Sequence, residues 1–164
     1  MIETEQFHSI PQPEDISIRE REDAMGAYLM MFAAIAAGLP LPIINLIASI
    51  IYYFINRGKS LFVKFHSLQS LLSQIPTSLI NASGVFWAIR IIFYGAEFSN
   101  LFKGYLVFIG AVNIVYVIFS LIAAVKARKG NFYYFILFGK IAYLQTYIVK
   151  EVEQKIDVNL PPKL

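Results

Sequence analysis

The chain has 164 residues, of which 57% are hydrophobic and 15% are charged, and its formal net charge is +3. In a soluble domain about a quarter of the residues are charged, so this composition argues against a water-soluble helical bundle and favours a small integral membrane protein. The Lys and Arg residues lie at the ends of apolar segments, as in membrane proteins, which argues against nucleic acid as a partner. With no cysteine in the chain, disulfides and cysteine-bound metals are excluded.

Residues 1–17 are polar and contain two prolines. This composition predicts a flexible tail on the cytoplasmic side. The segment lacks a basic stretch followed by an apolar one, so we expect no cleavable signal peptide. Ser17 and Glu20 have the spacing of a capping box, which predicts that a helix starts there.

Residues 24–55 are apolar but are interrupted by Gly38, Pro40 and Pro42. A single helix over this range would be roughly 45 Å long, whereas the bilayer core is about 30 Å thick. A hairpin would give two short helices of about 15–17 residues each, at the lower limit for a membrane span. Because two prolines this close do not fit inside an unbroken helix, the sequence favours the hairpin, with helices at about 20–38 and 41–56. The single span is the alternative.

Two further helices follow, predicted over 65–94 and 102–128. Each is bordered by a basic cluster that we expect to determine topology, the first made of Arg57, Lys59 and Lys64 and the second of Lys126, Arg128 and Lys129. Two spans separate the clusters, so both lie on one side, which the positive-inside rule assigns to the cytoplasm. The hairpin interpretation then gives four membrane helices with both termini in the cytoplasm. The single-span alternative gives three, with the N-terminus outside.

The region 131–149 is apolar but rich in tyrosine. Tyrosine prefers the headgroup layer, so we predict an interfacial helical segment on the cytoplasmic face, with a fifth span as the alternative. The predicted fold class is therefore an all-α polytopic membrane protein. Its expected organisation is a flexible tail at 1–17, a four-helix membrane domain at 18–130, and an interfacial segment with a polar tail at 131–164.

Six polar side chains in or beside the apolar segments are candidate partner-contact or intramembrane polar residues: His66, Gln69, Gln74, Asn45, Asn81 and Asn113. Polar groups in hydrocarbon are costly and mark contacts or pathways, although single amides also serve as hydrogen bonds between helices. A metal site needs three or four ligands, and no acidic residue lies in an apolar segment to complete a catalytic triad. We therefore predict no catalytic, cofactor-binding or metal site, and a protein that is not an enzyme.

Two stretches carry a resemblance to a known family. They are Gly-Leu-Pro-Leu-Pro-Ile-Ile-Asn at 38–45 and Phe-Val-Lys-Phe-His-Ser-Leu-Gln-Ser-Leu-Leu at 62–72. Together with the helix that ends at 122–127 and the Gly-Asn-Phe-Tyr run after it, they resemble the small membrane subunit of the chloroplast inner-envelope (Tic) protein-import translocon and its bacterial relatives. The resemblance covers about residues 25–135. It implies four helices and a role in or beside a protein-translocation assembly.

The resulting hypothesis is a non-enzymatic membrane subunit whose partners are the lipid bilayer and other membrane proteins, in a translocation machinery or another membrane assembly. The alternative is a small oligomeric channel or carrier that uses Asn45, Gln74 and Asn113. The expected location is the inner (plasma) membrane of a bacterium, as a multi-pass protein, with the plastid inner envelope as the alternative.

Overall fold

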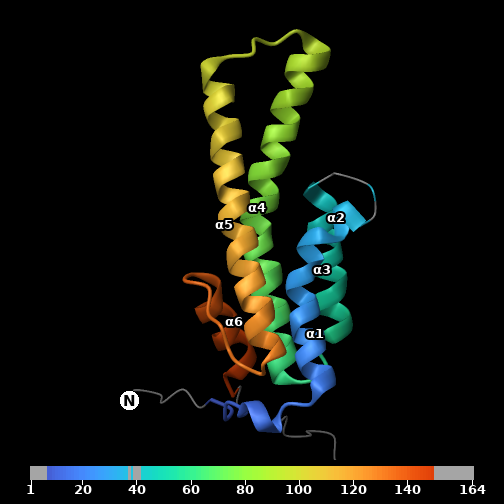
Figure 1. Ribbon diagram of the computed structural model, residues 1–164, viewed down its shortest axis with the longest axis vertical. Helices are drawn as coiled ribbons and strands as arrows, with labels where there is room; N and C mark the ends of the chain where they lie inside the picture. The colour runs from blue at the N-terminus through green and yellow to red at the C-terminus, as the bar shows by residue number, and fades with distance from the viewer. Residues whose placement is uncertain (1–6, 37, 39–41, 150–164) are drawn as a thin grey trace, which may run out of the picture.

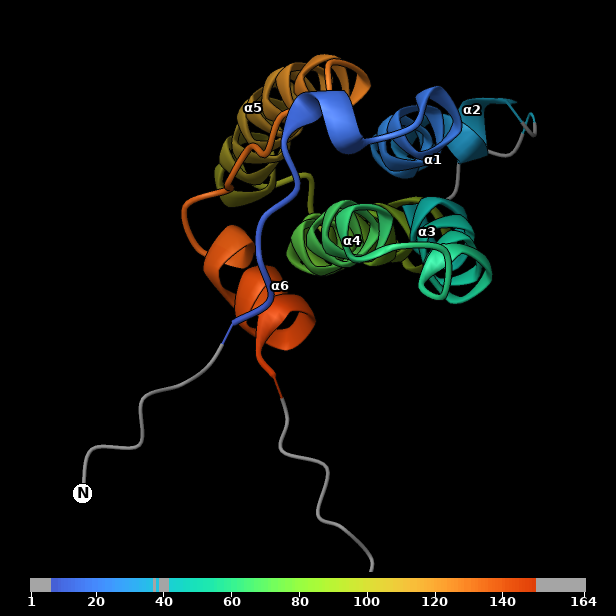
Figure 2. The ribbon, with the colours of Figure 1, turned by 90° about the horizontal axis from the view of Figure 1, so that it is seen from below.

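Two long antiparallel helices form the axis of the molecule. They are α4 (Leu61–Tyr94) and α5 (Asn100–Arg128), which run its whole length (Figure 1). The computed structural model describes residues 7–36, 38 and 42–149. Shorter helices surround only the lower half of the long hairpin, on both sides of α4 (Figure 2). The all-α prediction is confirmed for the described residues, whose one β feature is an isolated bridge between Phe7 and Ile148.

The first apolar segment folds as a short hairpin beside α4. Helix α1 (Ile18–Leu29) continues through a 3₁₀ turn, Met30–Phe32, into α2 (Ala33–Ala36), and α3 (Pro42–Asn56) runs back beside it. Near the lower end, the Tyr52 hydroxyl donates a hydrogen bond to the Asp23 carbonyl at 2.8 Å. Of the two interpretations of this segment, the structure has the hairpin, although residues 37 and 39–41 of the predicted break lie outside the described residues.

Serine hydroxyls set the starts of three helices. Ser17, Ser60 and Ser99 each accept a hydrogen bond from the backbone N–H three residues later, at 3.2, 3.3 and 3.2 Å. Such caps satisfy backbone donors that a helix start leaves free. They explain why α4 and α5 begin at Leu61 and Asn100 rather than at the predicted residues 65 and 102.

The first and last described segments of the chain meet at the base, where Phe7 and Ile148 form the isolated bridge. Helix α6 (Phe138–Tyr147) packs against α4, and its 10 residues are too few to span a membrane, which excludes the fifth-span alternative. The ring of Phe7 stacks on that of Tyr143 in α6 with centroids 5.6 Å apart, and His8 N donates to the Tyr147 carbonyl at 2.8 Å. Residues 1–6 of the predicted flexible tail and the predicted polar tail at 150–164 lie outside the described residues.

The prediction that four helices cross the membrane is wrong. In the part of the chain that the structure describes, only α4 and α5 are long and apolar enough to cross a bilayer. Their 34 and 29 residues give lengths of about 51 and 43 Å. Helix α3 has 15 residues, fewer than the ~20 required. The first arm is helical over 18–36, but residues 19–23 are charged, and its apolar part, 24–36, is also too short. The interruption at 38–42 divides the first apolar segment into halves that are each too short.

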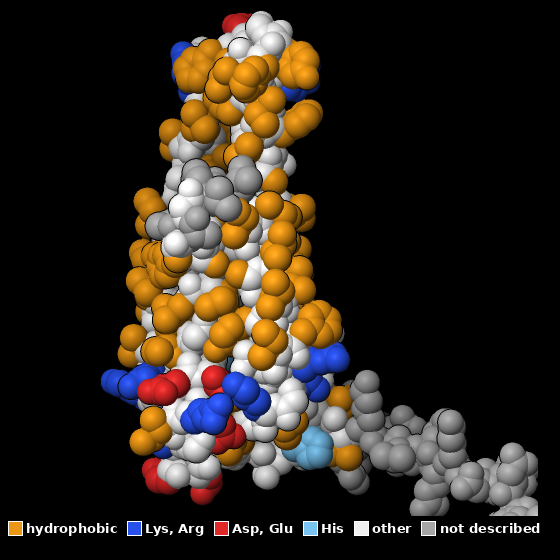
Figure 3. Space-filling model, turned by 90° about the vertical axis from the view of Figure 1, so that its right-hand side faces the viewer, with side chains coloured by type: hydrophobic (Ala, Val, Ile, Leu, Met, Phe, Trp, Pro, Cys, Tyr) orange, Lys and Arg blue, Asp and Glu red, His pale blue; other side chains and the backbone are white. Residues whose placement is uncertain are grey.

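The surface of the long hairpin suits a hydrocarbon environment. Hydrophobic side chains cover the shaft of the molecule, and charged side chains gather at its base, with a smaller number at the opposite tip (Figure 3). On α5 no charged residue lies between Lys103 and Lys126. That interval rises about 35 Å along the helix and therefore matches a hydrocarbon core of about 30 Å.

Candidate functional site

A hydrogen-bonded chain of side chains links α1, α4 and the segment after α5. His66 on α4 is fully buried, and its Nδ1 lies 2.9 Å from the Tyr28 hydroxyl. The Gln69 amide nitrogen donates to that hydroxyl and to the Tyr133 carbonyl, both at 2.8 Å, and the Gln69 Oε1 accepts from Phe135 N at 3.2 Å. The network thus connects the centre of the bundle to the extended segment that precedes α6.

The directions of the hydrogen bonds in this network determine which ring nitrogen of His66 carries the proton. The Tyr28 oxygen accepts from Gln69, so its own hydrogen is free to bond His66 Nδ1, which leaves the imidazole proton on Nε2. This Nε2 has no hydrogen-bond partner among the described atoms. The imidazole ring lies among aromatic rings, with its centroid 4.5 Å from that of Phe62 and 5.0 Å from that of Phe65. The site therefore holds a neutral histidine inside an aromatic shell.

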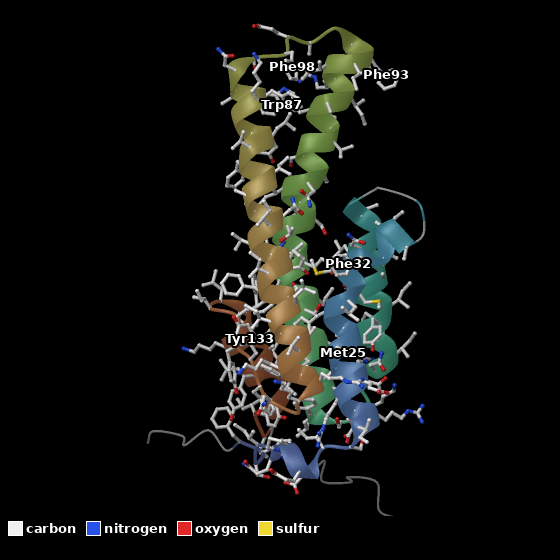
Figure 4. The ribbon with its side chains drawn as sticks, viewed as in Figure 1. Met25, Phe32, Trp87, Phe93, Phe98 and Tyr133 are labelled. Atoms are coloured by element: carbon white, nitrogen blue, oxygen red, sulfur yellow. The ribbon has the colours of Figure 1, made fainter. Side chains whose placement is uncertain are left out.

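Four of the six candidate polar residues meet around a single cavity of about 170 Å³. They are Asn45 from α3, Gln74 and Asn81 from α4, and Asn113 from α5. Met31 and Phe32 add an apolar wall from the upper end of the short hairpin, where Figure 4 shows Phe32. The cavity therefore lies beside the place where this hairpin stops and the long one continues.

The side-chain oxygen of each of these four amides accepts a hydrogen bond from within the protein. Asn81 and Asn113 bond each other, the Ser49 hydroxyl donates to Gln74 Oε1, and Ala34 N donates to Asn45 Oδ1 at 2.6 Å. These bonds join the short hairpin to α4, and α4 to α5, at the level of the cavity.

The residues predicted to determine topology lie at the base. Lys59 pairs with Asp23 and Arg128 with Glu22, each at 2.7 Å. The Arg57 guanidinium lies 4.7 Å from the centre of the Phe54 ring, and the remaining members of the set are Lys64, Lys126 and Lys129. Exposed ion pairs stabilise by at most about 1 kcal/mol, so these charges matter more for placement than for folding.

The sequence grouped the six polar residues as one set, whereas the structure separates them. His66 and Gln69 are enclosed near the base, and the four amides surround the higher cavity. Sequence reasoning missed the partners Tyr28 and Ser49. The sequence could have pointed to Tyr28, because it is the one polar side chain between residues 24 and 38. Within the described ranges, no three His, Asp or Glu side chains are grouped so as to hold a metal ion.

Comparison with known proteins identifies a family. The model of the MamF/MmsF family, described as the magnetosome magnetite crystal formation protein family, matches residues 20–142. This range covers about three quarters of the chain and runs from α1 into α6. No curated protein and no solved structure matches the chain.

The family match overturns the resemblance to the chloroplast translocon subunit and, with it, the role in protein translocation. The channel or carrier alternative and the plastid location receive no support from it either. Residues 62–72, which carried the resemblance, include the most enclosed part of α4. Their pattern is accounted for by packing against α1, α3 and α6.

Proposed function

The chain belongs to the MamF/MmsF family, and on this basis we propose that it is a non-enzymatic protein of the magnetosome membrane that takes part in magnetite crystal formation. The observation that carries the proposal is the extent of the match, which includes α1 to α5 and the start of α6. The long apolar hairpin supports a place in a bacterial membrane.

The proposed topology follows from the charges at the base. The basic clusters at 57–64 and 126–129 favour the cytoplasmic face for that end. Helices α4 and α5 then cross the magnetosome membrane, and the turn at 95–99 reaches the interior of the magnetosome. The short hairpin enters from the cytoplasmic face and ends within the bilayer, because its helices are too short to cross.

The protein has little surface on the interior side of the membrane in this arrangement. The turn at 95–99 carries one carboxylate, Glu97. Trp87 packs on Phe102 and Phe98 on Phe102, with ring centroids 5.3 and 5.5 Å apart, just below the turn (Figure 4). The upper half of the long hairpin, in contrast, has large exposed apolar side chains and no shorter helix beside it. We therefore place the action of the protein in the plane of the membrane, through contacts with other magnetosome membrane proteins.

Complementation tests the proposed function. The chain is expressed in a magnetite-forming bacterium from which the resident family member has been deleted. We expect the protein in the magnetosome membrane fraction and crystal sizes, measured by electron microscopy, that return toward those of the undeleted strain. Recovery of the protein only in the general inner membrane, with crystals unchanged, contradicts the proposal.

Two variants separate action within the membrane from action at the turn. Replacing Phe86 and Ile89 by alanine trims exposed apolar side chains on upper α4, 64% and 42% exposed, but keeps the helix apolar. We expect this change to weaken the rescue of crystal size, whereas Glu97→Gln leaves it intact. The opposite pattern places the action at the turn and contradicts lateral association.

A further inference from the structure

A second hollow lies along the long hairpin and shares only Thr77 and Tyr116 with the lining of the polar cavity. Its volume is about 490 Å³, and apolar side chains form most of its wall. Pro76 and Ile80 line it from α4, and the segment 133–138 closes it from the side. On α5 it follows one stripe: Phe108, Val112, Val115 and Phe119. We call this hollow the outer groove.

The dimensions of the outer groove indicate what fits it. From Phe108 to Phe119 the α5 stripe rises about 16 Å, and the rings of Phe119 and Phe135 meet at its lower end with centroids 6.4 Å apart. A continuous apolar groove of this length suits a single extended hydrocarbon chain.

A lysine lies on the same stripe below the groove. Lys126 follows Phe119 by seven residues, so it lies on the same face of α5 about 10 Å closer to the base. Side chains of a helix lean toward its N-terminus, which on α5 is the direction of the groove. Lys126 is exposed and forms no ion pair with any described residue, whereas Arg128, two positions later, is held by Glu22. The basic end of the hairpin is also the level at which headgroups lie.

We propose that the outer groove is a binding site for one anionic phospholipid. One acyl chain occupies the groove between α5 and the segment 133–138, and Lys126 binds the phosphate. Ile136 and Leu137, which are 92% and 68% exposed, extend the apolar wall into the surrounding hydrocarbon. The lipid thus joins α5 to the segment that Gln69 holds from within. This site is independent of the proposed part in crystal formation.

Native mass spectrometry of the full chain in detergent tests the site. The probes are dioleoylphosphatidylglycerol, which is anionic, and dioleoylphosphatidylcholine, which is zwitterionic. We expect one phosphatidylglycerol retained per chain. Val115→Trp fills the groove and should lower retention roughly tenfold or more. Its matched control is Val107→Trp, at a position that is 74% exposed and outside the groove, and it should retain the lipid as the unaltered chain does.

Further variants test the headgroup contact and guard against misfolding. Lys126→Gln should weaken phosphatidylglycerol about fivefold and leave phosphatidylcholine unchanged, whereas Lys103→Gln at the other end of α5 should change neither. Ala111→Trp fills the same groove from a second position, and circular dichroism checks that each variant keeps its helices.

Three outcomes overturn the proposal. Equal retention by the variants at 115 and 107 means that the lipid does not occupy the groove. Equal loss of both lipids on Lys126→Gln means that the lysine does not select the anionic headgroup. A dimer of the unaltered chain that Val115→Trp dissociates means that a second copy, and not a lipid, fills the groove.

Discussion

Asn81 on α4 and Asn113 on α5 exchange hydrogen bonds across the long hairpin. The Nδ2 of Asn81 donates to Oδ1 of Asn113 at 3.0 Å, and the reverse bond measures 2.7 Å. Asn113 gives its second amide hydrogen to the Ile109 carbonyl at 2.8 Å. Because both residues lie within an apolar shaft, where an unpaired amide is costly, this pair helps to fix the register of the two helices beside the cavity.

Replacing one asparagine of the pair should cost more than replacing both. Asn81→Leu or Asn113→Leu leaves one amide without its partner, and we expect a loss of about 1–2 kcal/mol in the free energy of unfolding. The double leucine variant removes both amides and should unfold close to the unaltered protein. Unfolding in detergent followed by circular dichroism measures this cycle. Losses that simply add in the double variant contradict a coupled pair.

The Tyr28 hydroxyl should matter for both stability and the protonation of His66. Tyr28→Phe leaves His66 Nδ1 without a partner and removes one of the bonds of Gln69, so we expect a loss of about 1–3 kcal/mol. The control, Tyr94→Phe, changes a side chain that is 79% exposed and should have no effect. Nitrogen NMR of the unaltered protein should find the imidazole proton on Nε2. A proton on Nδ1 contradicts the hydrogen-bond order derived above.

Gly139 should tolerate no side chain, because α6 begins close against the preceding segment. A Cβ at this position would lie 2.8 Å from both the Tyr134 Cα and the Gln69 Oε1. Gly139→Ala should therefore displace the segment and cost roughly 1–3 kcal/mol. Gly104→Ala is the matched change in open space, where alanine should stabilise α5 by about 0.5–1 kcal/mol. Thermal unfolding of the two variants should shift in opposite directions, and a shift in the same direction refutes the argument.

The start of α1 should weaken at acid pH. The Ser17 hydroxyl donates to the Glu20 carboxylate at 2.7 Å, and this bond lowers the pKa of Glu20 below its ordinary value. A lowered pKa means that the stabilisation is present above the pKa of the unfolded chain and is lost as the pH falls through the folded value. We expect the unaltered protein to lose a few tenths of a kcal/mol in this acid range, and Glu20→Gln to remove that part of the pH dependence. Unfolding midpoints at pH 3 to 7 measure it, and identical profiles argue against the cap.

Local signals predicted the helical class, the short hairpin and the cap at Ser17, because each depends on residues close together in the chain. The number of spans was not predictable in the same way, since apolar composition marks lipid-compatible segments without showing how far each helix continues. The separation of His66 and Gln69 from the four amides depends on which faces of α3, α4 and α5 meet. The partner Tyr28 is 38 residues from His66, a separation that periodicity along one helix does not reveal.

The basic cluster at Arg57, Lys59 and Lys64 should control orientation. Changing all three to glutamate removes the positive charges that hold this loop in the cytoplasm and places an acid beside Asp23, with which Lys59 now pairs. The second cluster at 126–129 remains, so we expect a mixture of orientations, whereas His66→Ala should leave the orientation unchanged.

The chain has no cysteine, so Glu97→Cys in an otherwise unaltered chain gives a single reporter in the turn for a membrane-impermeant maleimide. When the chain is expressed in a bacterium that forms no magnetosomes, the label should reach this turn in intact cells from the outer side of the inner membrane, and labelling should drop when the three charges are reversed. Because His66 is enclosed within the bundle, its variant should label as the reference does. Unchanged labelling of the charge-reversed chain refutes the assignment of topology to this loop.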